Sequence, residues 1–277
     1  MTASIAPSTI DIAGVATAVI DVGGPGSGQP PVLLLHGSGP GVSATANWRA
    51  VLPPLRAGRR RVIAPDQLGF GGTATGEPRT FGRAAWTRHA LALLDALGVP
   101  EVDVIGNSMG GAIALSMAVA RPSAIRRIVL MGTMGVAMPL PPGLDTVWGY
   151  APGVEAMREV IGLFAYDRGL INDDLVRMRY EASLDPPVRD SWAAMFPAPR
   201  QRWVDDLALS GAELAAVNRP VLMVHGRDDR VVPWRSSSLP LVDLLPDCRL
   251  HVIGGCGHWT MIEKTAEFLA VVSPFLA

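Results

Sequence analysis

Short, mainly apolar runs recur along the chain and give its clearest structural signal. A run that is apolar at successive positions is typical of a central strand buried on both faces of a parallel sheet. Strands with little alternation of polar and apolar positions therefore favour a sheet covered by helices on both sides. Such runs occupy residues 32–35, 61–64, 102–105, 128–131, 221–224 and 250–253, and residues 16–22 also fit a strand.

Helical patterns lie between several of these predicted strands. In residues 85–97 apolar side chains recur at helical spacing, and Gly98 follows at the expected end of the helix. Residues 263–275 also have the pattern of a helix. Alternating strands and helices predict an α/β protein with a doubly wound, mostly parallel sheet.

Residues 134–205 interrupt this alternation. They begin near the sequence Pro-Leu-Pro-Pro and contain short amphipathic pieces, but no clear central strand. We interpret residues 134–205 as a helical lid, or cap, inserted over the carboxyl end of the sheet. Residues 1–133 and 206–277 then form the α/β core domain. The alternative is a continued α/β domain whose strands the pattern does not reveal.

Composition narrows the functional classes. The 277 residues are 49% hydrophobic with a formal net charge of −1, so neither nucleic acid nor an anionic membrane is an expected partner. No apolar run reaches the length of a membrane span, and no Lys or Arg precedes Arg49, whereas a secretory signal needs a basic segment at its start. Two cysteines do not make a disulfide framework. We expect a cytoplasmic protein.

The strongest chemical signal is a serine between glycines. Residues 106–111 read Gly-Asn-Ser-Met-Gly-Gly, after a predicted strand and before a strong helix-forming segment. A G-x-S-x-G pattern in a strand–turn–helix context is typical of a nucleophile elbow, which exposes the serine hydroxyl at the end of the sheet. Ser108 is therefore a candidate nucleophile. Seen alone, the same pattern also fits a serine that caps the helix.

A nucleophilic serine needs a base, and the base needs an orienting acid. Among five histidines, His258 stands in a Gly-rich loop directly after a late strand, which favours it as the base. The acid is expected in the loop after residues 221–224, where Asp228 and Asp229 compete. Neighbouring residues of an extended loop point in opposite directions, so only one of them faces His258. The G-x-x-D-x-x-x-P spacing favours Asp229 over Asp228.

The loop after residues 32–35 reads His-Gly-Ser-Gly-Pro-Gly, a pattern that supplies an oxyanion-hole N–H in such hydrolases. We expect the backbone N–H groups of Ser38 and Met109 to form this hole, and His36 to brace the loop. No metal-ligand spacing occurs, and the loop has neither the dinucleotide fingerprint nor the lysine of a phosphate loop. The sequence therefore predicts no metal and no cofactor.

With these residues in place, the chain resembles the α/β-hydrolase fold family and, within it, the meta-cleavage product hydrolases. Those enzymes hydrolyse a C–C bond in 2-hydroxy-6-oxohexa-2,4-dienoates produced by aromatic ring cleavage. The elbow and loop motifs are shared with α/β-hydrolases in general, whereas the lid segments resemble the meta-cleavage product hydrolases in particular. The matching segments are HGSGPG at 36–41, GNSMGG at 106–111, GRDDRVVP at 226–233, GCGHW at 255–259, FAYDR at 164–168, MRYE at 178–181 and AMFPAPRQRW at 194–203.

The resemblance implies roles that spacing does not supply. Arg179 matches a lid arginine that holds the substrate carboxylate, and a guanidinium suits bidentate binding of that group. It also implies a small-molecule substrate carrying a carboxylate, such as 2-hydroxymuconate semialdehyde or a 6-alkyl analogue, and a homo-oligomer, with a dimer as first choice. Further substrate-binding positions matched in this way are Asn47, Asn107, Gly39, Phe164 and Trp259.

Two other functions use the same pattern. A carboxylesterase, lactonase or thioesterase would need the same three residues, and a non-enzymatic ligand receptor can be built on the same fold. An ester without a carboxylate, tested against a ring-cleavage dienoate, distinguishes the first alternative. The intact set of Ser108, Asp229 and His258 argues against the second.

Overall fold

A computed structural model of the chain describes residues 6–24, 28–58, 60–74 and 80–277, which form one eight-stranded sheet. The strand order is β1-β2-β4-β3-β5-β6-β7-β8. From β4 to β8 neighbouring strands are parallel, whereas β2 is antiparallel to both of its neighbours. The strands are β1 (Ser8–Ile12), β2 (Val15–Val22), β3 (Val32–Leu35), β4 (Val62–Pro65), β5 (Val102–Asn107), β6 (Ile125–Met131), β7 (Val221–Gly226) and β8 (Cys248–Ile253).

The α/β fold class predicted from the apolar runs is confirmed. Every residue of β3, β4, β5 and β7 is buried, as a sheet covered on both faces requires. Sequence reasoning missed β1, because an edge strand that is largely exposed carries little apolar pattern. The last helix, predicted over residues 263–275, begins later than predicted, at Thr265. A break at Lys264 separates it from a short helix over Thr260–Glu263.

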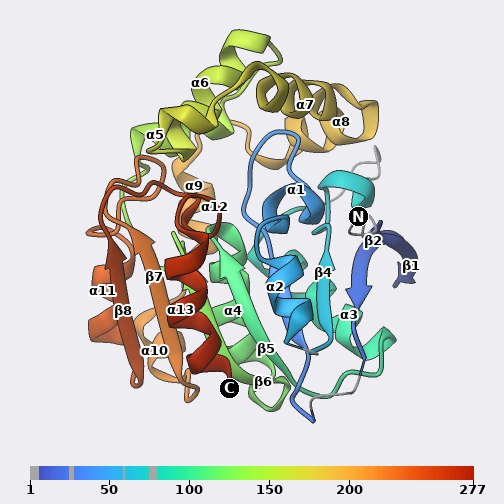
Figure 1. Cartoon of the computed structure of the whole chain (residues 1–277), viewed down its shortest axis with the longest axis vertical. Helices are drawn as coiled ribbons and strands as arrows, with labels where there is room; N and C mark the ends of the chain where they lie inside the picture. The colour runs from blue at the N-terminus through green and yellow to red at the C-terminus, as the bar shows by residue number, and fades with distance from the viewer. Residues whose placement is uncertain (1–5, 25–27, 59, 75–79) are drawn as a thin grey trace.

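Helices cover both faces of the sheet (Figure 1). The α-helices are α1 (Ala44–Trp48), α2 (Leu52–Ala57), α3 (Arg83–Ala96), α4 (Met109–Ala120), α5 (Pro142–Trp148), α6 (Val154–Phe164), α7 (Asp173–Leu184), α8 (Pro186–Met195), α9 (Gln201–Leu207), α10 (Gly211–Ala215), α11 (Ser238–Leu244), α12 (Thr260–Glu263) and α13 (Thr265–Leu276). Three short 3₁₀ turns are η1 (Gly71–Thr73), η2 (Pro122–Ala124) and η3 (Arg168–Leu170).

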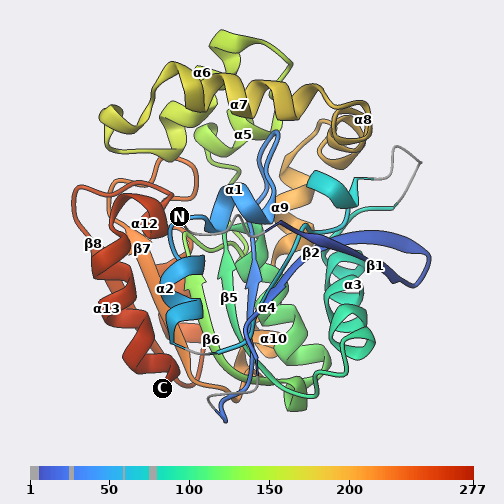
Figure 2. The same ribbon diagram turned by 45° about the vertical axis from the view of Figure 1, so that its right-hand side comes forward.

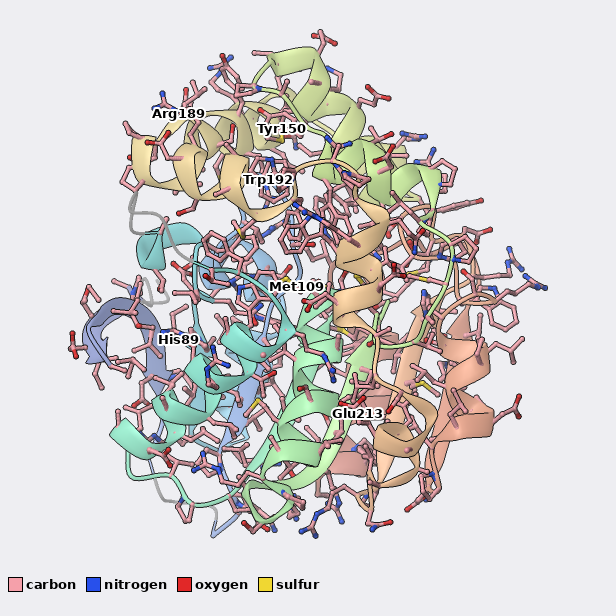
Figure 3. All side chains as sticks on the ribbon, turned by 180° about the vertical axis from the view of Figure 1, so that it is seen from behind. His89, Met109, Tyr150, Arg189, Trp192 and Glu213 are labelled. Atoms are coloured by element: carbon pink, nitrogen blue, oxygen red, sulfur yellow. The ribbon has the colours of Figure 1, made fainter. Side chains whose placement is uncertain are left out.

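Helices α2 and α13 lie on one face of the sheet, and α3, α4 and α10 lie on the other (Figures 1 and 3). Helix α4 is apolar all round, and nine of its twelve residues are buried, since it packs under the centre of the sheet. Among the described helices, none is long and apolar enough to cross a membrane.

The chain between β6 and β7 forms helices. Helices α5 to α8 gather beyond the ends of the strands, at the top of the molecule (Figures 1 and 2). The two ends of this segment meet, because the Leu209 N–H donates to the Gly135 carbonyl at 3.0 Å. Seen from behind, Met109 lies at the end of α4 that faces these helices, with Tyr150 and Trp192 above it (Figure 3). The division into a core and a lid at residues 134 and 205 stays a prediction.

Candidate active site

Ser108 sits on a sharp turn between β5 and α4. Its backbone φ of 54° and ψ of −117° lie outside the usual regions for a residue with a side chain. The turn is held because the Ser108 N–H donates to the Met131 carbonyl at 2.8 Å, and the Ser108 carbonyl accepts from Met134 at 3.1 Å. The strained geometry predicted for a nucleophile elbow is therefore present.

Three glycines allow this crowding. A Cβ on Gly106 would lie 2.4 Å from the Gly110 carbonyl oxygen, and a Cβ on Gly110 would lie 2.1 Å from the Leu35 oxygen. Strand β5 and helix α4 thus approach each other as the G-x-S-x-G pattern predicts. A Cβ on Gly37 would lie 2.9 Å from the Cβ of Ser108, so the loop after β3 packs directly against the serine.

His258 and Asp229 come from the loops after the neighbouring strands β8 and β7. The His258 Nδ1–H donates to Asp229 Oδ2 at 2.7 Å, and both side chains are almost fully buried. An ionised carboxylate only accepts, so this contact fixes the proton on Nδ1 and leaves Nε2 as the basic nitrogen. The backbone N–H of His258 donates to the Phe164 carbonyl at 2.8 Å, which secures the loop from the side of α6.

Of the two competing aspartates, Asp229 is the one that contacts His258. Its Oδ1 accepts the N–H groups of Val231 at 2.8 Å and Val232 at 2.9 Å. Burial alone would raise the pKa of this carboxyl, but the charge of His258 and hydrogen bonds from His225 and His258 outweigh it, so the pKa lies well below its usual range. Asp228 instead accepts from Gly255 and lies 3.5 Å from the Arg227 guanidinium.

The turn that holds Ser108 also contacts the His258–Asp229 pair. Gly132 follows Met131, the partner of the Ser108 N–H, and has a φ of +48°. A Cβ there would lie 2.8 Å from His258 Nδ1 and 3.2 Å from Asp229 Oδ2. In the described part of the chain the Ser108 hydroxyl has no hydrogen-bond partner; in ligand-free hydrolases the serine–histidine contact is often loose.

The loop after β3 presents free donors beside the serine. Within the described residues, the backbone N–H groups of Ser38 and Met109 donate to no protein group. The Ser38 hydroxyl is occupied, because it accepts from the Trp148 Nε1–H at 2.9 Å. Two N–H groups beside a nucleophile form the geometry of an oxyanion hole. His36 braces the loop as predicted: its Nδ1–H donates to the Gly37 carbonyl at 2.8 Å, and its Nε2 accepts from the Gln67 N–H at 3.0 Å.

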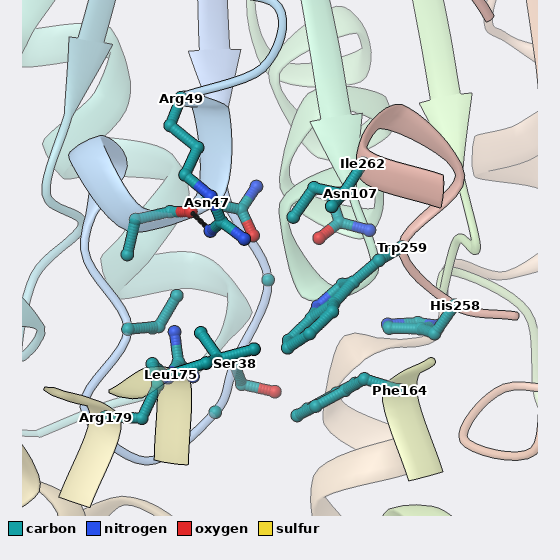
Figure 4. A pocket seen from close by; sticks show the side chains of 14 residues that line it. Ser38, Asn47, Arg49, Asn107, Phe164, Leu175, Arg179, His258, Trp259 and Ile262 are labelled. Carbon is teal, nitrogen blue, oxygen red and sulfur yellow. Dashed lines mark hydrogen bonds between the residues drawn. The ribbon is translucent and has the colours of Figure 1, made fainter. Parts of the chain in front are cut away.

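A pocket lies between the loop after β3, called the oxyanion loop below (residues 36–41), and His258 (Figure 4). Its floor is buried, and its rim consists of partly or fully exposed residues. The lining includes two arginines but no acidic residue. The lining residues are Gly37, Ser38, Gly39, Val42, Ala46, Asn47, Arg49, Asn107, Phe164, Leu175, Arg179, His258, Trp259 and Ile262.

Arg179, from α7, is a buried cation without an acidic partner among the described residues. Its Nη2 donates to the Pro40 carbonyl at 2.9 Å, while its buried Nε has no partner in the part of the chain that the structure describes. Burial and the nearby charge of Arg49 lower the pKa of Arg179 to about 10. An isolated buried charge is costly, so this guanidinium is suited to an anion that enters the pocket.

The other residues implied by the resemblance also reach the pocket. Asn47 is buried and its Nδ2 has no partner within the described ranges, whereas the Nδ2 of Asn107 donates to the Met131 carbonyl at 3.2 Å. Phe164 stacks on the rings of Trp259 and His258, with centroids 5.0 and 5.5 Å apart (Figure 4). A Cβ on Gly39 would lie 3.4 Å from both Phe164 and Arg179, so this glycine belongs to the same wall.

Four further residues at this site escaped the sequence reasoning. Arg49, Leu175 and Ile262 line the pocket, and no motif or periodicity marks them. His225, treated from sequence as a structural residue at the end of β7, contacts Asp229 Oδ2 at 3.1 Å. Its place four residues before the acid was the available signal. In the described part of the chain, no cluster of three or more His, Cys, Asp or Glu residues could hold a metal ion.

Comparison with known proteins agrees with this geometry. The model of the alpha/beta hydrolase fold family matches residues 30–265. The chain is 50% identical to the 2-hydroxymuconate semialdehyde hydrolase of Pseudomonas sp. strain CF600, covering 89% of this chain and 87% of the relative. It is 49% identical to the 2-hydroxy-6-oxo-2,4-heptadienoate hydrolase of Pseudomonas putida, covering 95% and 94%.

Solved structures give the same result. A mutant of the meta-cleavage product hydrolase of Pseudomonas fluorescens IP01, complexed with acetates, superposes with a TM-score of 0.93 at 44% identity, covering 98% of this chain and 97% of that chain. The predicted resemblance is confirmed: the chain is a hydrolase of the alpha/beta hydrolase fold family and belongs, within it, to the meta-cleavage product hydrolases.

Proposed function

We propose that this chain uses Ser108, His258 and Asp229 to hydrolyse the C–C bond of 2-hydroxy-6-oxohexa-2,4-dienoates. The products would be 2-hydroxypenta-2,4-dienoate and a carboxylic acid. The observation that carries the proposal is the unpaired, buried guanidinium of Arg179 in the same pocket as His258 and the oxyanion loop. A simple esterase has no need of a cation at that place, whereas a dienoate brings a carboxylate to it.

The polar end of the pocket suits the first step. With the carboxylate on Arg179, Asn47 can donate its unpartnered Nδ2–H to a substrate oxygen. The dienol must shift its 2-hydroxyl proton to C5 before the bond breaks, because only the 2-keto tautomer can accept the electrons of the C5–C6 bond. His258 is the proposed proton carrier, since an imidazole exchanges protons in either direction near neutral pH.

Cleavage then follows the acyl-transfer pattern. The Ser108 hydroxyl attacks C6 while His258 takes its proton, and the N–H groups of Ser38 and Met109 bind the resulting oxyanion. The C5–C6 bond breaks, its electrons move through C4 and C3 to the 2-keto oxygen, which takes the proton from His258, and the acyl group remains on Ser108. Water, deprotonated by His258, hydrolyses this ester and restores the serine.

We further propose that residues 134–205 act as the lid of this site. Three contacts support it: Trp148 donates to the Ser38 hydroxyl, Arg179 donates to Pro40, and the Phe164 carbonyl accepts from His258. The segment therefore contacts the oxyanion loop and the histidine loop at once. Such a cover excludes water while the bond to C6 breaks.

The names of the two relatives at about 50% identity favour hydrogen or methyl at C6 of the substrate. Aromatic and branched side chains enclose the pocket: Phe164, Trp259, Leu175 and Ile262. One methylene changes such discrimination by only about 1–3 kcal/mol, so larger 6-alkyl groups belong in the test. A cytoplasmic location and a dimer stay predictions of the sequence.

A panel of coloured ring-cleavage products that differ only at C6 tests the proposal directly. We expect the purified protein to bleach the compounds with hydrogen or methyl at C6 with a kcat/KM far above that for p-nitrophenyl acetate. Ser108→Ala should abolish turnover but still bind the dienoate. Comparable or higher efficiency on p-nitrophenyl acetate, or turnover by Ser108→Ala near that of the native protein, would refute the scheme.

A further inference from the structure

His225 is a buried titratable residue that the proposed mechanism does not use. It lies in β7, four residues before Asp229, and has no exposed surface. Its ring makes three polar contacts, to Ser238, to Asp229 and to the Val232 carbonyl. A histidine that merely filled space would need only one partner for each ring nitrogen, so the contact with Asp229 requires its own explanation.

The contacts determine which nitrogen carries the proton. The Val232 carbonyl, 2.8 Å from Nε2, can only accept, so Nε2 bears the hydrogen. The same N–H is shared with Asp229 Oδ2 at 3.1 Å. In the neutral ring Nδ1 is then an acceptor, and the Ser238 hydroxyl donates to it at 2.7 Å. The Val232 carbonyl and the Asp229 carboxylate thus select the tautomer of His225 that faces Asp229 with a donor, and Ser238 holds the ring by its other nitrogen.

The Asp229 carboxylate is held from four directions. Two backbone N–H groups, of Val231 and Val232, occupy Oδ1, and the ring N–H groups of His225 and His258 both reach Oδ2. A carboxylate with donors on both oxygens cannot rotate without breaking one of these bonds. The oxygen that faces His258 is thus fixed by a second imidazole on its other side.

We propose that His225 is a positioning residue for the active site, and that Ser238 acts through it. The hydrogen-bonded series Ser238, His225, Asp229, His258 keeps Oδ2 directed at His258 Nδ1. Without the Ser238 hydroxyl, Nδ1 loses its donor and the ring is held from one side only, so its N–H can turn away from Asp229 toward the Val232 carbonyl. Asp229 would then lose a donor and shift relative to His258.

Ser238→Ala is the sharpest test, because it leaves the imidazole in place. Its matched control is Ser237→Ala, which removes the neighbouring buried hydroxyl whose bond goes to the Pro233 carbonyl instead. We expect Ser238→Ala to lower kcat for 2-hydroxy-6-oxohepta-2,4-dienoate about tenfold and to keep KM within about twofold. Loss of a hydrogen bond that orients a functional residue from behind typically has an effect of this size. Ser237→Ala should keep both constants.

A second pair of variants addresses the ring itself. His225→Gln keeps an N–H that reaches the place of Nε2, whereas His225→Met keeps volume without a donor. We expect Gln to restore part of the kcat that Met loses. Equal kcat in the two folded variants would contradict the proposal.

Two readouts do not depend on the dienoate, although the proposal rests on the proposed function. One is the rate at which diisopropyl fluorophosphate modifies Ser108, which should slow in Ser238→Ala by the same factor as kcat. The other is the downfield proton resonance of the His258 Nδ1–H, which should move in Ser238→Ala and not in Ser237→Ala. A native protein that reacts with the fluorophosphate but not with dienoates would refute the proposed function alone.

Two outcomes would overturn the role of His225. In one, Ser238→Ala keeps the native kcat, the native rate of modification and the native resonance. In the other, Ser238→Ala and Ser237→Ala lose kcat equally, which would mean that both act through packing of α11.

Discussion

The two ends of the pocket treat their polar groups in opposite ways. The proposed catalytic end is Ser108, Asp229 and His258, of which His258 lines the pocket. There the carboxylate has four donors, and His258 is fixed by its ring bond to Asp229 and its backbone bond to Phe164. At the proposed recognition end, formed by Arg49, Arg179 and Asn47, buried N–H groups of Arg179 and Asn47 have no partner among the residues that the structure describes.

The difference shows what each end is built for. Reacting groups whose hydrogen bonds are all made are held in place before the substrate arrives. No free energy is then needed to orient them during the reaction. Unsatisfied buried donors destabilise the free protein and are stabilised when a ligand supplies the missing acceptor. We therefore expect substitutions at the catalytic end to lower kcat, and substitutions at the recognition end to raise KM.

The largest effect is expected from Asp229→Asn. An amide keeps the shape but offers His258 the wrong hydrogen-bond partner, and in serine hydrolases such a change lowers kcat by about 10⁴-fold. Asp228→Asn is the matched control, because that carboxylate forms a partly exposed ion pair worth at most about 1 kcal/mol. Steady-state kinetics on a dienoate measures both variants. Similar losses in the two would exclude the assignment of the acid.

Arg179→Met should raise KM rather than lower kcat. Removing one member of a buried charge pair typically costs about 2–5 kcal/mol of binding, so KM for dienoates should rise about 30-fold or more. Hydrolysis of p-nitrophenyl acetate should hardly change. The free protein should melt no lower than the native one, since the variant removes a buried charge that lacks an acidic partner. A clear fall in Tm would mean that Arg179 supports the fold rather than the ligand.

The pH dependence of KM provides a milder test of the same residue. The pKa of Arg179 is lowered to about 10, so this base loses its charge as pH rises through that value. KM for dienoates should therefore increase above pH 10, by about tenfold for each further unit. Arg179→Met should lack this increase. A native profile that is flat up to pH 11 would contradict the assignment.

The sequence could predict the catalytic end because its chemistry imposes local constraints. The elbow needs glycines at fixed distances from Ser108, and the loops after β7 and β8 must present Asp229 and His258 at adjacent strand ends. These demands leave spacing patterns that a single sequence carries. The same holds for the buried strands, whose apolar runs follow from being covered on both faces.

The recognition end leaves no such pattern. Arg179 stands on a helix whose other residues are mostly exposed, and only the family resemblance distinguished it from a surface charge. Arg49 and His225 were missed because their roles depend on what the fold places opposite them. The edge strand β1 was missed for a related reason. It pairs with one strand only and is mostly exposed, so its sequence need not be apolar.

Substitution of Arg49 should have the smallest effect on the kinetics, and it distinguishes the role of Arg49 from that of Arg179 within the recognition end. Arg49 is exposed at the rim of the pocket, and among the described residues it has no acidic partner. A rim charge mainly changes the association rate, so Arg49→Gln should lower kcat/KM for dienoates only about two- to fivefold, and kcat hardly at all.

The loss should fade as salt is added, because at 1 M ionic strength charges are screened beyond about 3 Å. Arg179→Met should keep its defect at high salt, since a buried pair is screened far less. The two arginines thus divide into one that attracts the carboxylate and one that holds it. If instead the defect of Arg49→Gln persists at 1 M salt, Arg49 contacts the bound substrate, and both arginines hold its carboxylate.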